Sequence, residues 1–337
     1  MSSASSSAAA WFTRLEPTTP PDSACRPDDP RLGECVEFWR EGPPKLRPGR
    51  PVLVGFPQDD GVRRNQGRPG AAAAPAAIRP WLYRLTPWDA TCGADLAALG
   101  LFDLGNVRID GDLEASQQAL ADVIAVILTA GAVPIVLGGG HETAYGHYLG
   151  YVRAGREVAI INLDAHLDVR PLVDGLGHSG SPFRQALEHP TQPLRGDRYV
   201  CLGAQPFAVS REHQAYVQDR GGVIRWGSRS SLHYVLNAIF RHECKRLSAA
   251  GCPVYVTLDS DFVCQADVPG VSAPNPLGLS GRVVAACAAA AGECAAVSSF
   301  DLVEINPSLD RDGQSARWAA LTLWHFLRGL TRRTKTN

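Results

Sequence analysis

The 337-residue chain lacks the features that mark membrane and nucleic-acid-binding proteins. It has no run of about 18 apolar residues, so no segment is expected to span a bilayer. Its formal net charge is −1 and it has no dense basic stripe, which argues against nucleic acid and membrane as partners. The N-terminal MSSASSSAAAWF lacks the basic start and long apolar core of a secretory signal. We therefore expect a cytoplasmic protein.

Disulfide staples are also not expected. The nine cysteines are scattered and odd in number, and no two of them form a CxxC pair. A chain of this length does not depend on cross-links for stability, so the cysteines are predicted to be reduced, mostly buried apolar residues. Hydrophobic residues make up 45% and charged residues 20%, which is typical of a globular protein with a sizeable core.

From residue 51 onward, apolar segments typical of strands alternate with segments of helical periodicity. Strands are predicted at residues 52–55, 101–104, 134–137, 158–163, 199–202, 223–225, 254–258 and 296–303. Helices are predicted at residues 71–85, 113–130, 142–152, 182–188, 210–220, 232–247, 280–291 and 315–330. This alternation indicates an α/β fold, with a mostly parallel sheet covered by helices on both faces. We divide the chain into a Pro/Ser/Ala-rich arm (1–49), a single catalytic domain (50–331) and a short tail (332–337).

The most informative stretch is VAIINLDAHLD at residues 158–168, an apolar strand followed at once by Asp164, His166 and Asp168. In an extended chain, a spacing of two residues puts all three side chains on one face. Open α/β sheets bind ligands at the carboxyl ends of their strands. One such residue alone is usually just solvated. Three together after a buried strand indicate half of a metal site.

Two further segments repeat this pattern. IVLGGGHE carries His141 after an apolar strand, and VYVTLDSD carries Asp259 and Asp261. The three glycines match neither GxGxxG nor GxxxxGK[ST], so we interpret them as allowing close backbone packing. A lone histidine at a helix start is more often structural. Together, however, four aspartates and two histidines suit a pair of hard divalent ions, and Mn²⁺ suits them better than Zn²⁺.

The segments GGGHE, NLDAHLD, TLDSD and DLVEINP resemble the four signature segments of the ureohydrolase superfamily, which includes arginase and agmatinase. The resemblance covers about residues 51–330. It implies the three-layer α/β/α arginase-like fold with a roughly eight-stranded sheet, a homo-oligomer, and two Mn²⁺ per subunit. One ion would be bound by His141, Asp164, Asp168 and Asp259, and the other by Asp164, His166, Asp259 and Asp261. The implied chemistry is hydrolysis of a C–N bond at a guanidinium or amidine carbon.

Within this superfamily, GFPQDDGVRRNQGRPG at residues 55–70 resembles the formimidoylglutamase branch. The implied reaction converts N-formimidoyl-L-glutamate to L-glutamate and formamide, a step of histidine breakdown. Such a dicarboxylate substrate needs cationic side chains, and Arg63, Arg64 and Arg170 are candidates because guanidinium binds carboxylate bidentately. Asn65 and Ser179 complete the expected substrate site. An arginine pair in a glycine-rich loop can equally be a solvated turn.

The resemblance also implies catalytic roles. Glu304 would hold the cationic formimino group, and Asp168 would orient the attacking hydroxide. Either Asp168 or His178 would protonate the leaving nitrogen. Arginases carry a proton-shuttling histidine in this loop, but here Ser179 aligns with it and His178 lies one place earlier, so His178 either reaches the site or faces water.

Two alternatives remain open at this stage. The chain could be another ureohydrolase, acting on agmatine, guanidinobutyrate or arginine, which would not need two arginines near the entrance. It could also be an inactive relative that binds metal as a regulatory or binding subunit.

Overall fold

The computed structural model describes residues 11–20, 28–227 and 232–333. Within them, all eight predicted strands are present, with ends shifted by a few residues at most. They are β3 (Pro51–Gly55), β6 (Phe102–Val107), β7 (Val133–Leu137), β8 (Ala159–Leu163), β9 (Tyr199–Ala204), β10 (Val223–Trp226), β11 (Val254–Asp259) and β12 (Val297–Val303). The α/β prediction is confirmed.

In the described part of the chain, the main sheet has ten strands, because two short strands of the predicted arm join its edge. Its order is β1-β6-β3-β7-β12-β11-β8-β9-β10, and β2 also pairs with β6. The two additions are β1 (Leu15–Glu16), which runs antiparallel to β6, and β2 (Glu37–Phe38), which runs parallel to it. All pairings among the eight longer strands are parallel. A separate two-stranded sheet is formed by β4 (Trp88–Asp89) and β5 (Ala94–Asp95).

The eight predicted helices are also present. They are α3 (Ala74–Tyr83), α4 (Leu113–Thr129), α5 (Thr143–Arg153), α6 (Pro182–Leu187), α7 (Arg211–Gln218), α8 (Leu232–Ala249), α9 (Gly281–Glu293) and α10 (Gln314–Thr331). Two short helices were not predicted as such, α1 (Leu32–Cys35) and α2 (Asp60–Arg64). Several helices begin at a side-chain cap: Asp112 accepts the N–H of Ala115 at α4, and Ser210 accepts that of His213 at α7. Among the described residues, no helix is long and apolar enough to cross a membrane.

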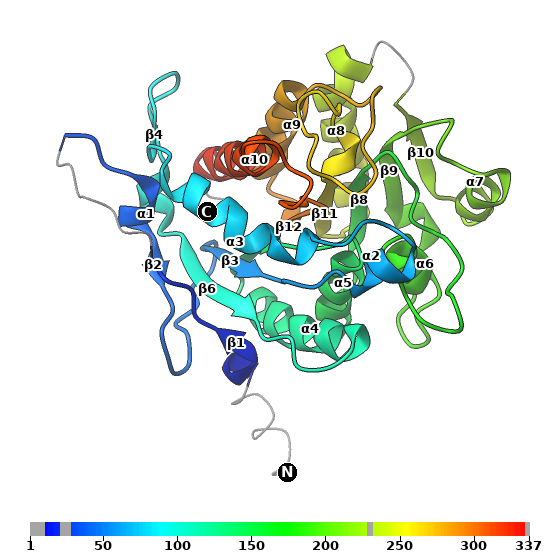
Figure 1. The fold of residues 1–337 in the computed structure, drawn as a ribbon, viewed down its shortest axis with the longest axis horizontal. Coiled ribbons are helices and arrows are strands. Elements are labelled where there is room, and N and C mark those ends of the chain that lie inside the picture. The colour runs from blue at the N-terminus through cyan, green and yellow to red at the C-terminus, as the bar shows by residue number, and fades with distance from the viewer. Residues whose placement is uncertain (1–10, 21–27, 228–231, 334–337) are drawn as a thin grey trace, which may run out of the picture.

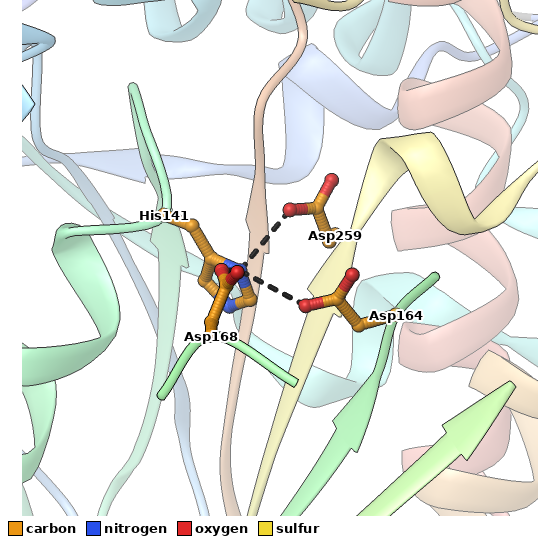
Figure 2. A group of neighbouring side chains, drawn as sticks. All are labelled: His141, Asp164, Asp168 and Asp259. Atoms are coloured by element: carbon orange, nitrogen blue, oxygen red, sulfur yellow. Dashed lines mark ion pairs between the residues drawn. The ribbon is translucent and has the colours of Figure 1, made fainter. Parts of the chain in front are cut away.

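The helices lie on both faces of the sheet, which makes three layers (Figure 1). The carboxyl ends of the central strands all point to one rim, as parallel pairing requires. The end of β11 and the loops that follow β7 and β8 bring polar side chains together there (Figure 2). This rim is where an open α/β sheet binds its ligands.

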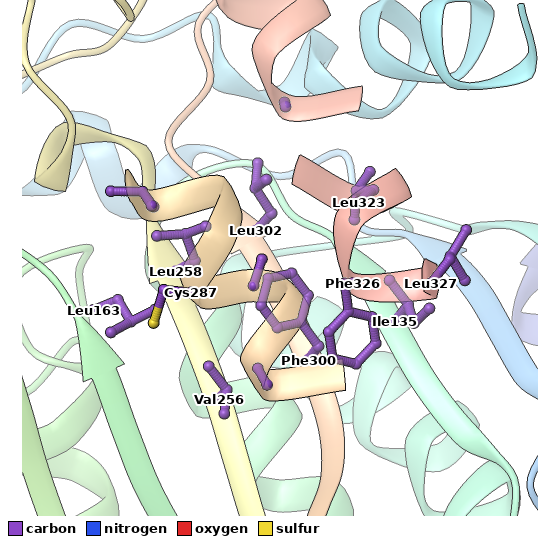
Figure 3. Packing of buried hydrophobic residues seen from close by; sticks show 14 of the residues in the cluster. Ile135, Leu163, Val256, Leu258, Cys287, Phe300, Leu302, Leu323, Phe326 and Leu327 are labelled. Atoms are coloured by element: carbon purple, nitrogen blue, oxygen red, sulfur yellow. The ribbon is translucent and has the colours of Figure 1, made fainter. Parts of the chain in front are cut away.

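Each face of the sheet has its own hydrophobic core. Ile135 and Leu137 of β7 belong to a core shared with α3, α8, α9 and α10, whereas Val136 between them belongs to a core shared with α4 and α5. This alternation follows from the period of two along a strand. In the first core, Phe300 and Phe326 stack with ring centroids 4.5 Å apart (Figure 3). Truncating such a phenylalanine to alanine typically costs about 3–5 kcal/mol.

Candidate active site

The glycine turn after β7 positions His141 at the rim. A Cβ atom on Gly139 would lie 1.9 Å from the carbonyl oxygen of Gln58, so only glycine permits this approach. The same oxygen of Gln58 accepts the N–H of Gly140 at 3.0 Å. The His141 N–H then donates to a carboxylate oxygen of Glu304 at 2.7 Å. The predicted role of the glycines in close backbone packing therefore matches the contacts.

The ring of His141 faces three carboxylates from two other strand ends (Figure 2). Its Nδ1 lies 2.9 Å from Asp168, 3.1 Å from Asp259 and 3.4 Å from Asp164. The four residues offer ligand atoms that all lie within 4.8 Å of one another. Nε2 of the same ring lies 3.1 Å from Oγ1 of Thr257, which leaves Nδ1 as the atom directed at the carboxylates.

A second group lies beside the first and shares Asp164 with it. It consists of Asp164, His166 and Asp261. Nδ1 of His166 lies 3.1 Å from Asp261 and 3.5 Å from Asp164. Asp259, expected from the family resemblance to serve both ions, is grouped here with the first set alone. Asp261 lies on the short turn Ser260–Phe262 and its N–H donates to Asp259 at 2.9 Å, so the two carboxylates are held side by side.

The carboxylates of this cluster outnumber its two imidazoles, so the chain balances their negative charge only in part. Burial, followed by the charges of Asp261 and Asp164, raises the pKa of Asp259 well above its ordinary value. Burial likewise raises the pKa of Asp261 to about 6. Asp164 differs: burial would raise its pKa, but the imidazoles of His141 and His166 beside it outweigh burial and lower it.

Two buried atoms of the cluster have no hydrogen-bond partner among the described residues, Nδ1 of His141 and Oδ1 of Asp261. Unpaired buried polar atoms are rare and call for an explanation. Carboxylate oxygens with imidazole nitrogens are the donors that hard divalent ions prefer. Divalent cations at these two groups would satisfy both atoms and the excess negative charge, so the residues present fit a two-ion centre.

Two residues of the rim have left-handed backbone conformations that are unusual outside glycine. The φ angle is +46° at Asp168 and +67° at Glu304. Such conformations cost free energy and concentrate at functional sites. Here they follow β8 and β12, where the chain must turn sharply to direct each carboxylate.

Glu304 lies deep in the rim, with about 5% of its surface exposed. Burial, followed by the charge of Asp259, raises its pKa to about 8. Its contact with the backbone of His141 ties the end of β12 to the end of β7. Glu304 was predicted to hold a cationic group, and a buried carboxyl at this place would gain from such a partner.

Three of the predicted substrate-binding residues lie together on the loops of the rim. Nη1 of Arg170 donates to Oδ1 of Asn65 at 3.1 Å, and Nδ2 of Asn65 donates to Oγ of Ser179 at 3.0 Å. The two other arginines already have protein partners. Arg64 donates to both carboxylate oxygens of Glu114 at 2.6 and 3.0 Å, and Arg63 is exposed and paired with Asp60.

His178 occupies neither of the two positions considered from the sequence. Its ring is buried rather than facing water. Nδ1 accepts the N–H of Gly180 at 3.1 Å, so the proton lies on Nε2, which donates to the carbonyl oxygen of Pro171 at 3.0 Å. Both nitrogens are thus engaged by backbone groups, which leaves neither free to pass a proton to a substrate. The contacts indicate that His178 shapes the loop.

Three residues that were not predicted from the sequence form hydrogen bonds that hold the site or its neighbouring loop in place. Thr257 lies under the ring of His141, and Nδ2 of Asn162 donates to Asp164 at 2.9 Å. Glu142, the last residue of GGGHE, accepts the N–H of Gly61 at 2.8 Å. Thr257 and Asn162 each lie two residues before a predicted ligand, so the period of two along the strand was the available signal. Glu142 contacts a residue 81 positions away, which no local pattern indicates.

The profile described as the Arginase family matches residues 50–328. With this match over most of its length, the chain belongs to the arginase family. Among its relatives, the formimidoylglutamase of Chromobacterium violaceum is 36% identical over 311 residues, which cover 90% of this chain and 96% of that protein. The formimidoylglutamase of Rhodococcus jostii is 40% identical over 285 residues, 81% of this chain and 83% of that protein.

Solved structures agree with the fold described above. The Trypanosoma cruzi formiminoglutamase, determined with Mn²⁺, superposes with a TM-score of 0.82 at 33% identity, covering 91% of this chain and 100% of that chain. The Bacillus subtilis formimidoylglutamase gives a TM-score of 0.84 at 24% identity, covering 94% of this chain and 96% of that chain, and supports the fold. The arginase-like architecture predicted from the sequence is therefore confirmed.

Proposed function

We propose that this chain is a formimidoylglutamase, which hydrolyses N-formimidoyl-L-glutamate to L-glutamate and formamide. The observation that carries the proposal is the double cluster of carboxylates and imidazoles at the strand ends, in a chain whose relatives share this activity by name. In the reaction, water adds to the formimino carbon and the bond from that carbon to the glutamate nitrogen breaks. The oxygen leaves in formamide, and the nitrogen leaves protonated on glutamate.

His141, Asp164, Asp168 and Asp259 would hold one divalent ion, and Asp164, His166 and Asp261 the second, with Asp259 expected from the family resemblance as a further ligand. Mn²⁺ is our proposal for both ions, since oxygen donors dominate and Zn²⁺ prefers more nitrogen or sulfur. Bound ions would lower the pKa of a water and polarise the atom that it attacks.

Two carboxylates of the chain act on the reacting atoms. Glu304 accepts hydrogen bonds from the cationic formimino group, and that cation would in turn favour the ionised form of the buried carboxyl. The side chain of Asp168 is about 10% exposed, so part of it remains accessible beside His141. Asp168 accepts the proton of the attacking water and delivers it to the leaving nitrogen. His178 is not assigned this role, because both of its nitrogens are engaged.

The substrate's carboxylates bind at the rim formed by Asn65, Arg170 and Ser179. Arg170 is exposed and uses Nη1 on Asn65, which leaves other guanidinium N–H groups for a carboxylate. Arg64 serves instead to hold the loop, since it pairs with Glu114 and also donates to the carbonyl oxygen of Gly177. Arg63 is a weaker candidate, because its guanidinium is paired with the carboxylate of Asp60.

The test is glutamate release from N-formimidoyl-L-glutamate by the Mn²⁺-loaded protein, with arginine, agmatine and guanidinobutyrate assayed in parallel. We expect turnover of the formimino substrate alone. Arg170→Ala should raise its KM by about tenfold, as expected for one lost charge-assisted contact. Arg156→Ala, a change at an exposed arginine at the other end of the sheet, should leave KM unchanged.

Urea released from a guanidino compound would contradict the proposed substrate and favour another ureohydrolase. No turnover of any of the four compounds by protein carrying two metal ions would contradict the proposed activity.

A further inference from the structure

The residue after His141 connects the metal-ligand end of the sheet to the substrate-binding loops. Glu142 is fully buried just before α5. Its Oε1 accepts the N–H of Gly61, in the first turn of α2, at 2.8 Å. The carboxyl group thus contacts a distant segment and makes no cap hydrogen bond to its own helix.

Two glycines make room for the Glu142 carboxyl group. A Cβ on Gly61 would lie 2.4 Å from Cδ of Glu142, and a Cβ on Gly140 would lie 2.1 Å from its Oε2. Both distances are far below van der Waals contact, so neither glycine can carry a side chain while the carboxyl group stays in place. The carboxyl group of Glu142, which precedes α5, is therefore packed closely against both the glycine turn and α2.

The peptide of Gly61 also contacts the residues that are proposed to bind the substrate. Its carbonyl oxygen accepts the N–H of Ser179 at 3.1 Å. Asn65, directly after α2, bonds Oγ of the same Ser179, and Arg170 bonds Asn65. Glu142 is therefore the first member of a continuous set of hydrogen bonds that ends at the residues proposed to bind the substrate's carboxylates.

The second oxygen of the Glu142 carboxyl group has no comparable role. This oxygen, Oε2, has no hydrogen-bond partner among the described residues. Burying an acid with one unpaired oxygen costs more than burying an apolar side chain of similar size. A residue that served only to fill the core would not need this group, whereas one that must hold an N–H of α2 does.

We propose that Glu142 is a positioning residue: it holds α2, and through it Asn65, Ser179 and Arg170, at a set distance from the metal ligands. Glu142 thereby governs the binding of the substrate's carboxylates and leaves metal binding unchanged. This inference rests on the proposed function for the identity of the bound group.

The test compares Glu142→Ala with Glu142→Gln in the Mn²⁺-loaded protein. Alanine removes the acceptor, so KM for N-formimidoyl-L-glutamate should rise by about tenfold to a hundredfold, with a smaller change in kcat. Glutamine keeps an oxygen at the same place and should restore a KM close to that of the wild type. Both variants should retain the wild-type metal content.

A matched control separates positioning from general loss of stability. Leu128→Ala removes a buried side chain of α4, remote from this network, and should lower Tm without changing KM. Gly61→Ala should raise KM like Glu142→Ala, because its Cβ displaces the same carboxyl group. The double variant should lose less than the product of the two single losses, since both remove one contact.

Hydrogen exchange provides a readout that does not need a substrate. The amides of residues 60–65 should exchange faster in Glu142→Ala than in the wild type and Glu142→Gln. If the wild type does not turn over the substrate, the proposed function is contradicted. If the amides of residues 60–65 still exchange faster in Glu142→Ala, the positioning role is upheld. Unchanged exchange, a glutamine variant that behaves like alanine, or a lower metal content in both variants would overturn the inference.

Discussion

Two buried charged clusters of this molecule differ in how their charge is balanced. On one side of the sheet, Asp103 of β6 accepts from Arg79 at 2.8 and 3.1 Å, from the N–H of Gly105 at 2.8 Å, and from the hydroxyl of Tyr83. Both Asp103 and Arg79 are buried. Here the chain supplies the cation and the hydrogen bonds that a buried carboxylate requires.

At the carboxyl ends of β7, β8 and β11, carboxylates outnumber imidazoles. None of the ion pairs of these carboxylates in the described part of the chain involves lysine or arginine. Unpaired charge in a protein interior is very costly. The first cluster is therefore complete within the chain, whereas the second has excess carboxylates that a divalent cation would balance.

The largest effect is expected from removing the carboxylate that both groups share. Asp164→Ala should lose both metal ions and at least about a thousandfold in turnover, or about 4 kcal/mol of transition-state stabilisation. Metal content and kcat are measured on the same preparation. Retention of two ions with normal turnover would contradict the assignment.

The next effect concerns stability. Asp103→Asn leaves the buried Arg79 without its counter-charge and should cost about 3–5 kcal/mol in the free energy of unfolding. Denaturant unfolding of the metal-free protein measures this loss. The folded fraction should still bind the same number of metal ions, and a changed stoichiometry would show that the two clusters are not independent.

A smaller loss is expected from the support under His141. Thr257→Val keeps the shape of the side chain but removes the partner of Nε2, and should weaken metal binding by about tenfold to a hundredfold. Calorimetric titration with Mn²⁺ measures the affinity. Thr129→Val, a change at an exposed end of α4, is the control and should leave the affinity unchanged. Equal Mn²⁺ affinities in the wild type, Thr257→Val and Thr129→Val would contradict a role of Thr257 in metal binding.

The last effect is gradual: a pH dependence of the stability of the metal-free protein. The pKa of Glu304 is raised from 4.5 to about 8 by burial and then by Asp259. The folded state therefore keeps a proton that the unfolded state has already released. This stabilisation is complete below pH 4.5 and is lost as the pH rises to about 8. The slope should not exceed about 1.4 kcal/mol per pH unit for this group.

Unfolding of the metal-free protein between pH 5 and pH 8.5 measures this slope. Glu304→Gln cannot titrate and should be less steep over the same range. A wild-type stability that rises with pH in this window would contradict the sign.

Much of the fold could be predicted because its elements carry long patterns. The apolar strand that became β8 and the helical periodicity of α10 are local properties of the chain. By contrast, β1 and β2 have two residues each and carry no period at all. The five-residue α2 contains a glycine and two arginines, which read locally as a loop.

The clustering of the proposed metal ligands could be predicted for a similar reason. Asp164, His166 and Asp168 follow one strand at a fixed spacing, and parallel pairing brings the ends of β7, β8 and β11 to the same rim. The hydrogen-bond partners of individual side chains could not be predicted from the sequence. Whether His178 is free depends on Pro171 and Gly180, and whether Arg64 is free depends on Glu114, 50 positions away.

We propose above all that the carboxylates and imidazoles at the strand ends bind two divalent ions. Calorimetric titration of the metal-free protein with Mn²⁺, followed by the assay with N-formimidoyl-L-glutamate at each point, tests it most directly. We expect two ions per chain and an activity that reaches its maximum when both have bound. Full activity in the metal-free protein, or saturation without any ion retained, would contradict it.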